Sequence, residues 1–89
     1  MTYTTTNIKE TLKTIKNLKN TNIKTITIWF ENNYLIEINK KDQIAVLYEF
    51  EPSTEHYHYQ GEYQSLIEDL QKGYIIYGKK HRYLGTDTM

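Results

Sequence analysis

The fold is decided by the stretch IKTITIWFENNYLIEINKKDQIAVLYEF, residues 23–50. Its three runs of β-branched and aromatic residues, 23–30, 34–38 and 43–50, are typical of β-strands, and the first two alternate with a period of two. Residues 31–33, Glu-Asn-Asn, separate the first pair, and asparagine tolerates the positive φ of a tight hairpin turn. The stretch therefore predicts an antiparallel meander of three strands. The side chains expected to face its core are Ile26, Ile28, Phe30, Ile36, Ile38, Val46 and Tyr48.

One helix is predicted before this meander in the sequence and a second one after it. Apolar residues recur at helical spacing in residues 8–18 and again in residues 63–70. Asn7 with Glu10 three residues later resembles a capping box, in which each side chain satisfies a backbone N–H at the helix start. Gly73 is placed to end the second helix, which we expect over residues 62–72.

The segments between and after these elements complete the predicted order. Pro52 cannot donate a ladder hydrogen bond, so the third strand should end near residue 50. Alternating His and Tyr in residues 55–60 predicts a short fourth strand, and residues 74–77 predict a short strand or extended edge. We therefore expect one α+β domain over residues 1–89, a three- to four-stranded antiparallel sheet with both helices on one face and the order α-β-β-β-(β)-α-(β). The C-terminal tail should be frayed from about residue 84.

Composition limits the class of protein. The 89 residues suffice for one small core, and the absence of cysteine excludes disulfides and thiolate metal ligands. The chain starts without a signal-peptide pattern, and no apolar run approaches the ~18 residues of a membrane span. These features predict a cytoplasmic protein.

Charge is distributed unevenly along a chain whose net charge is zero. Residues 1–24 carry five lysines against one glutamate, residues 25–69 nine acidic residues against two lysines, and residues 70–89 four cations against one aspartate. This pattern argues against a uniformly cationic nucleic-acid clamp. The basic ends either pair with the acidic centre, remain solvated or contact phosphates, and residues 77–83 mix basic and aromatic side chains in a way that suits single strands. The candidate nucleic-acid contacts are Lys9, Lys13, Lys16, Lys79, Lys80 and Arg82.

Catalytic and metal-binding patterns are sparse. The serines, Ser53 and Ser65, lie outside any nucleophile-elbow motif, and the four glycines form no phosphate loop, so we predict that the chain is not an enzyme. His56 and His58 share one face of a predicted strand, and two imidazoles so spaced can converge on zinc. The alternative is a pair of solvated histidines.

Tyrosine is unusually frequent, with nine in 89 residues. So small a core cannot hold them all, and exposed tyrosine is enriched at protein interfaces because it offers a large contact area at low rotamer cost. An aromatic patch with an acidic rim suits a basic protein partner. The predicted partner-binding patch consists of Tyr57, Tyr59, Glu49, Glu51 and Glu55.

In size, element order, lack of cysteine and its acidic, tyrosine-bearing patch over residues 49–62, the chain resembles small phage- and mobile-element-encoded inhibitors such as anti-CRISPR proteins. The resemblance implies a non-enzymatic inhibitor or adaptor that docks on a larger nucleic-acid-handling protein. The alternative is a nucleic-acid-binding accessory protein that uses the basic N-terminal helix and C-terminal tail. A homodimer stays open.

Overall fold

The computed structural model describes residues 3–41, 44–49, 54–60, 63–73, 75–76 and 79–89; of these, the side chains of residues 3–4, 49, 54–60 and 75–76 lie outside the description. The helices are α1 (Ile8–Lys16), the 3₁₀ turn η1 (Leu18–Asn20) and α2 (Gln64–Gln71). The strands are β1 (Tyr3–Thr5), β2 (Thr25–Phe30), β3 (Tyr34–Asn39), β4 (Ile44–Glu49), β5 (Thr54–Gln60), β6 (Ile75–Ile76), β7 (Lys79–Lys80) and β8 (Tyr83–Thr88).

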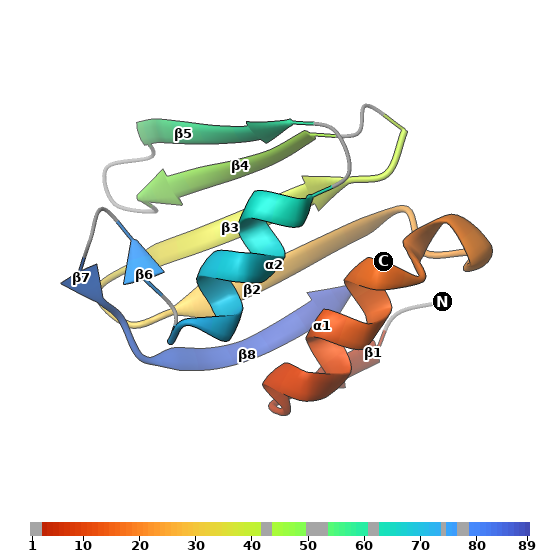
Figure 1. Ribbon diagram of the computed structural model, residues 1–89, viewed down its shortest axis with the longest axis horizontal. Coiled ribbons are helices and arrows are strands. Elements are labelled where there is room, and N and C mark those ends of the chain that lie inside the picture. Colours follow the sequence, from red (N-terminus) through yellow and green to blue (C-terminus); the bar gives the residue numbers. More distant parts are fainter. Residues whose placement is uncertain (1–2, 42–43, 50–53, 61–62, 74, 77–78) are drawn as a thin grey trace.

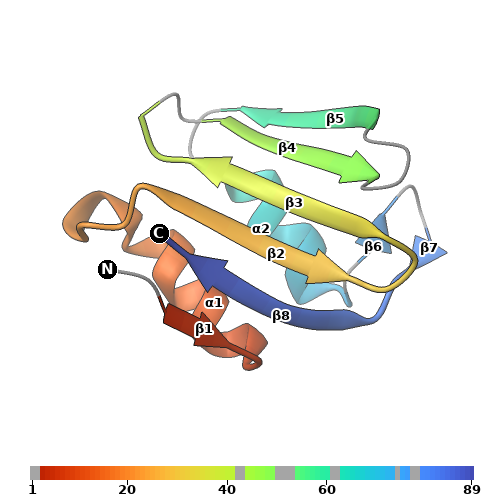
Figure 2. The same cartoon turned by 180° about the vertical axis from the view of Figure 1, so that it is seen from behind.

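Six of the strands form one antiparallel sheet in the order β1-β8-β2-β3-β4-β5, and β6 pairs with β7 in a separate hairpin. Both helices lie on the same face of the sheet (Figure 1). Seen from behind, the opposite face carries no helix in the part of the chain that the structure describes (Figure 2). The predicted α+β class, with an antiparallel meander and two helices on one face, is confirmed, and the sheet is wider than predicted because β1 and β8 join it.

Strand β8 replaces the frayed tail that the sequence predicted. It lies between β1 and β2, and the main chain of Met89 exchanges hydrogen bonds with Thr25 beyond its end. Thr86 and Thr88 are almost fully buried on the helix-bearing side. Buried threonine is tolerated where its hydroxyl is hydrogen-bonded, and its β-branched side chain suits a strand. A polar segment gives no hydrophobic alternation, so its pattern predicted a tail.

The buried hydroxyls of this region form a directed chain of hydrogen bonds. Thr11 Oγ1 donates to Thr86 Oγ1 at 2.8 Å, and Thr86 Oγ1 lies 2.7 Å from the Tyr83 hydroxyl. The Tyr83 hydroxyl donates in turn to the main-chain oxygen of Thr5 at 3.3 Å. Because the hydrogen of Thr11 is used on Thr86, the hydrogen of Thr86 is free to point at Tyr83. The chain ties α1, β8 and β1 together.

The core lies between the sheet and the helices. Its largest fully buried members on β2 and β3 are those predicted, from Ile26 to Ile38, and the stripe of α1 packs on them through Ile15. On β4 the buried residues are Ala45 and Leu47, whereas Val46 and Tyr48, which were expected in the core, are only half-buried and lie outside the core cluster. Since residues 44–48 are apolar throughout, their sequence gives no alternation from which the buried face could be predicted. The buried apolar side chains that β2, β3 and β4 contribute to the core cluster are Ile26, Ile28, Phe30, Ile36, Ile38, Ala45 and Leu47.

Local chemistry sets the element ends. The Asn7 side chain caps α1 by accepting from the N–H of Lys9 at 2.9 Å. The reciprocal half of the expected capping box runs through Thr5, whose hydroxyl accepts from the Asn7 N–H and donates to the Glu10 carboxylate. The β2–β3 turn places consecutive asparagines at φ 64° and 65°, as a tight hairpin requires. Gly73 ends α2 with a φ of 119°, which an L side chain rarely adopts.

Candidate functional site

The uncovered face of the sheet carries a strip of two aromatic side chains, Trp29 and Tyr48, with Leu35 between them. Strand register sets Trp29 opposite Leu35, and Leu35 opposite Tyr48, across β2, β3 and β4. Leu35 is only 6% exposed although it lies outside the core cluster, which shows that neighbouring side chains on this face cover it. Val46, on the same face of β4 as Tyr48, is half-buried. The strip is therefore packed and apolar, and it lies on the face that no described helix covers.

Carboxylates flank this strip. Thr27 pairs with Glu37 on one side and with Asp87 on the other, so both carboxylates belong to one row across the uncovered face. Both side chains are exposed. Trp29 Nε1 donates a hydrogen bond to Asp87 Oδ2 at 3.0 Å, which fixes the indole against β8. The described side chains of this face include no lysine or arginine. They are Thr25, Thr27, Trp29, Leu35, Glu37, Asn39, Ile44, Val46, Tyr48 and Asp87.

The predicted partner-binding patch lies beside this strip in the sheet, at its β4–β5 edge. Glu49 ends β4, Glu55, Tyr57 and Tyr59 belong to β5, and the side chains of all four lie outside the described part of the chain. Glu51 falls in residues 50–53, outside it altogether. In backbone register Tyr57 pairs with Leu47 and Tyr59 with Ala45. The patch thus remains a prediction from sequence.

The predicted zinc ligands lie on the same strand. His58 pairs in register with Val46, and His56 falls where the register shifts, between the pairs Leu47–Tyr57 and Tyr48–Glu55. A bulge of this kind changes the alternation of the strand, so the two positions need not share a face as expected. Their side chains lie outside the description. Among the described side chains, no group of three or more potential ligands converges.

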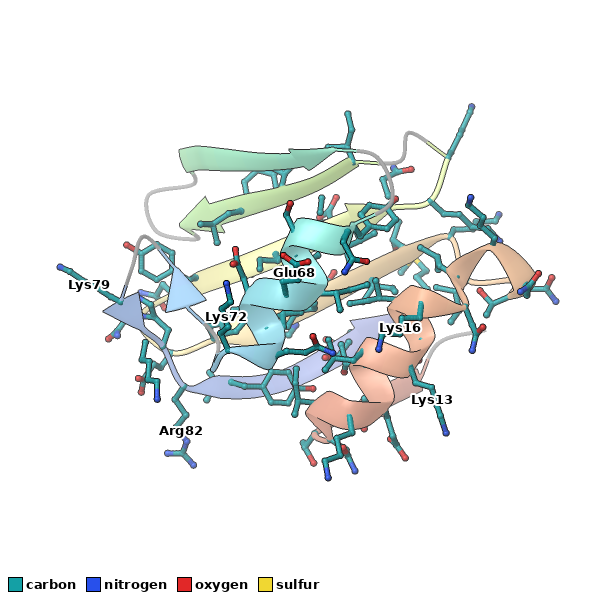
Figure 3. All side chains as sticks on the ribbon, viewed as in Figure 1. Lys13, Lys16, Glu68, Lys72, Lys79 and Arg82 are labelled. Carbon is teal, nitrogen blue, oxygen red and sulfur yellow. The ribbon has the colours of Figure 1, made fainter. Side chains whose placement is uncertain are left out.

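The predicted nucleic-acid contacts occupy the other side of the molecule. Lys13 and Lys16 on α1 lie at one end of the helix-bearing side, and Lys79 and Arg82 lie toward the other end, with α2 and Lys72 between them (Figure 3). All six predicted cations are exposed. The six thus form two separate groups, one on α1 and one at residues 79–82. They are Lys9, Lys13 and Lys16, and Lys79, Lys80 and Arg82.

An open hollow of about 590 Å³ lies beside α1. Its lining mixes one carboxylate and one ammonium group with hydroxyl, amide and aliphatic side chains, so it offers neither a convergent set of charges nor an enclosed apolar pocket. No helix within the described residues is long and apolar enough to cross a membrane. The lining residues are Glu10, Lys13, Thr14, Asn17, Thr21 and Ile23.

No protein-family model matches this chain, and neither a curated protein nor a solved structure is significantly similar to it.

Sequence reasoning missed the aromatic strip and its carboxylates. The signal was present, because Thr25, Thr27 and Trp29 alternate with the buried residues of β2. A tryptophan among the threonines of a strand indicates that the solvent-facing side of the sheet has a large apolar side chain available for contact. Asp87 could not have been added, since its strand was predicted to be a tail.

Proposed function

We propose that this protein is a non-enzymatic interaction module, an inhibitor or adaptor that docks on a larger protein through the uncovered face of its sheet. The observation that carries the proposal is the packed strip of Trp29, Leu35 and Tyr48 on a face that no described helix covers. Aromatic side chains held rigidly by their neighbours give large contact area at little entropic cost, which is typical of interface anchors.

The charge on this face points to the chemistry of the partner. Glu37 and Asp87 flank the strip, and no described lysine or arginine side chain lies on the face. A partner surface with lysine or arginine beside an apolar patch would complement both features. Nucleic-acid-handling proteins present such basic surfaces, which is why we favour one of them as the partner.

The sheet edge supports the same reading. β5 is the last strand in the sheet order, so among the described strands nothing pairs with its outer side. An edge strand of seven residues can accept an extended segment of another chain through main-chain hydrogen bonds. The predicted patch residues Tyr57 and Tyr59 belong to this edge strand, at register positions opposite Leu47 and Ala45.

The test is a matched pair of charge reversals. Glu37→Lys changes the uncovered face, and Glu68→Lys makes the same change at an exposed position of α2 on the helix-bearing face. Each tagged variant is used for affinity capture from host lysate treated with nuclease, and the partner identified with the wild type is then titrated. We expect Glu37→Lys to weaken the affinity by about fivefold or more and Glu68→Lys to leave it within about twofold. Equal affinities for the two variants would refute docking through this face.

A second pair tests the predicted edge patch in the same assay. The double variant Glu51→Lys, Glu55→Lys should have a lower affinity for the partner than the wild type at low salt. Unchanged affinity for that double variant, together with a loss for Glu37→Lys, would restrict the contact to the strip and remove the edge patch.

A further inference from the structure

The segments that form the helix layer and the β6–β7 hairpin carry an excess of positive charge. Residues 8–20 and 63–82 present eight described cations against three described carboxylates, an excess of five. Every one of the eight is exposed. The cations are Lys9, Lys13, Lys16, Lys19, Lys72, Lys79, Lys80 and Arg82, and the carboxylates are Glu10, Glu68 and Asp69.

Internal pairing does not account for this charge among the described residues. None of the eight cations forms an ion pair with a described carboxylate. Glu10, which lies beside Lys9 and Lys13 on α1, accepts a hydrogen bond from the Thr5 hydroxyl at 2.7 Å, and Glu68 accepts one from Gln64 at 3.2 Å. The cations thus face solvent, where a ligand can reach them.

The arrangement of the cations points to a polymer rather than a small anion. Lys9, Lys13 and Lys16 follow each other at i, i+4 and i+7 and form one stripe of α1. Lys79 and Arg82 lie toward the opposite end (Figure 3) of a molecule whose longest dimension is 32 Å. Charges distributed in this way cannot converge on one phosphate, but they can follow a chain of phosphates.

An anionic membrane is a poorer fit for this side. Its described helices expose no large apolar side chain, and the two that are exposed, Leu84 and Met89, lie on β8 and directly after it. Membrane-surface helices bury an apolar face in the lipid, and the apolar stripe of α1 is turned toward the core instead. Binding to lipid would therefore depend on charge alone.

The structure also changes the expected mode of nucleic-acid contact. Stacking of bases was expected from the tyrosines among residues 77–83, but the Tyr83 hydroxyl is held by Thr86 and Thr5, and its ring packs edge-on against Phe30 at 6.3 Å. The His81 ring lies against Tyr34, with the ring centroids 4.8 Å apart and the ring planes tilted by 59°. The described rings of this segment, Tyr83 and His81, are engaged within the fold and offer no free platform to unpaired bases, and Tyr77 lies outside the described residues.

We propose that the helix-bearing side binds double-stranded nucleic acid through its phosphates, without reading sequence. This surface is separate from the uncovered sheet face, so the protein would join a duplex to a protein partner. Duplexes suit the surface because they present phosphates at high density and need no stacking platform. Glu68, in the middle of this side (Figure 3), opposes binding and limits the affinity.

The test is fluorescence anisotropy with a labelled duplex of about 20 base pairs and a single strand of equal length, titrated across a salt series. With about five phosphates neutralised, affinity for the duplex should fall roughly 500-fold between about 50 and 200 mM salt. Lys13→Glu with Lys16→Glu removes two contacts and should reduce this fall to roughly 40-fold, with weaker binding throughout. Lys79→Glu with Lys80→Glu probes the other group in the same way, and Glu68→Gln should strengthen binding.

Lys41→Glu is the matched control, because Lys41 is an exposed lysine in the turn after β3, outside residues 8–20 and 63–82 that carry the eight cations. It should leave the salt dependence unchanged. No saturable duplex binding at about 50 mM salt, tighter binding of the single strand, or an equal loss with Lys41→Glu would overturn the proposal. Binding to vesicles of phosphatidylserine and phosphatidylcholine without binding to the duplex would overturn it too. These outcomes are independent of Glu37→Lys, so failure here leaves the proposed protein-docking face standing.

Discussion

Replacing Tyr83 with phenylalanine tests whether the C-terminal strand belongs to the folded core. The substitution keeps the ring that packs against Phe30 and removes only the hydroxyl. That hydroxyl lies 2.7 Å from Thr86 Oγ1 and 3.3 Å from the main-chain oxygen of Thr5. Its loss therefore interrupts the hydrogen-bond chain that joins β8 to α1 and β1.

The magnitude follows from the bonds that are lost. The Tyr83 hydroxyl also lies 3.2 Å from Thr11 Oγ1. The bond it donates to Thr5 and the bond it accepts from Thr86 contribute about 1 kcal/mol each, and the hydroxyl of Thr86, 1% exposed, loses its acceptor at Tyr83. We expect the free energy of unfolding to fall by about 2 kcal/mol, which lowers the melting temperature by roughly 8–16 °C in a domain of this size. Leu84→Ala, at a position 51% exposed on the same strand, should change the free energy of unfolding by less than about 0.5 kcal/mol.

The assay is urea denaturation of both variants, followed by circular dichroism and tryptophan fluorescence. Trp29 reports directly, because its indole is hydrogen-bonded to Asp87 on β8. If Tyr83→Phe is as stable as the wild type, or if Leu84→Ala is the more damaging change, the terminal segment is not held as described. A fluorescence transition that precedes loss of ellipticity would indicate that β8 detaches before the remaining sheet unfolds.

Two further substitutions test how the sequence sets local structure. Asn7→Ala removes the side chain that caps α1 and should cost about 1 kcal/mol of stability, whereas Asn7→Ser should retain most of it in thermal denaturation. Asn33→Val, at φ 65°, should destabilise the β2–β3 hairpin by about 1–2 kcal/mol, and Asn33→Gly should be neutral or slightly stabilising; the reverse order in chemical denaturation would contradict the turn geometry.

The sequence predicted an element correctly where the spacing of its apolar residues matches the period of a strand or a helix. Alternation in β2 and helical spacing in α1 predicted the elements and their buried faces, because each element buries only one side. In β4 the pattern was insufficient. Ala45 faces the core and Val46 does not, yet both are apolar, so only the pairing of the strand with β3 decides which is buried.

The C-terminal strand could not be predicted for a different reason. Its buried side chains include Thr86 and Thr88, which are polar, and their burial depends on partners more than 70 residues away, such as Thr11. No local pattern records such a partner. The strip centred on Leu35 was missed in the same way, since it exists only once three strands are in register.

For the candidate surfaces, too, some features follow from the sequence pattern and others only from the tertiary structure. That the lysines of α1 are exposed follows from the helical period, but their lack of described ion pairs and the internal engagement of Tyr83 follow only from the tertiary structure. The sequence predicted basic and aromatic side chains acting together over residues 77–83, whereas in the structure the cations of this segment are exposed and the Tyr83 ring packs within the fold.

The most direct test of two separate binding faces is affinity capture with nuclease and with both face variants compared. We predict that a partner protein is captured even after nuclease treatment. The double variant Lys13→Glu, Lys16→Glu should still capture it, and Glu37→Lys should capture less of it or none. A protein that is captured only with intact nucleic acid, and is lost with the lysine variant rather than with Glu37→Lys, would contradict docking through the uncovered sheet face.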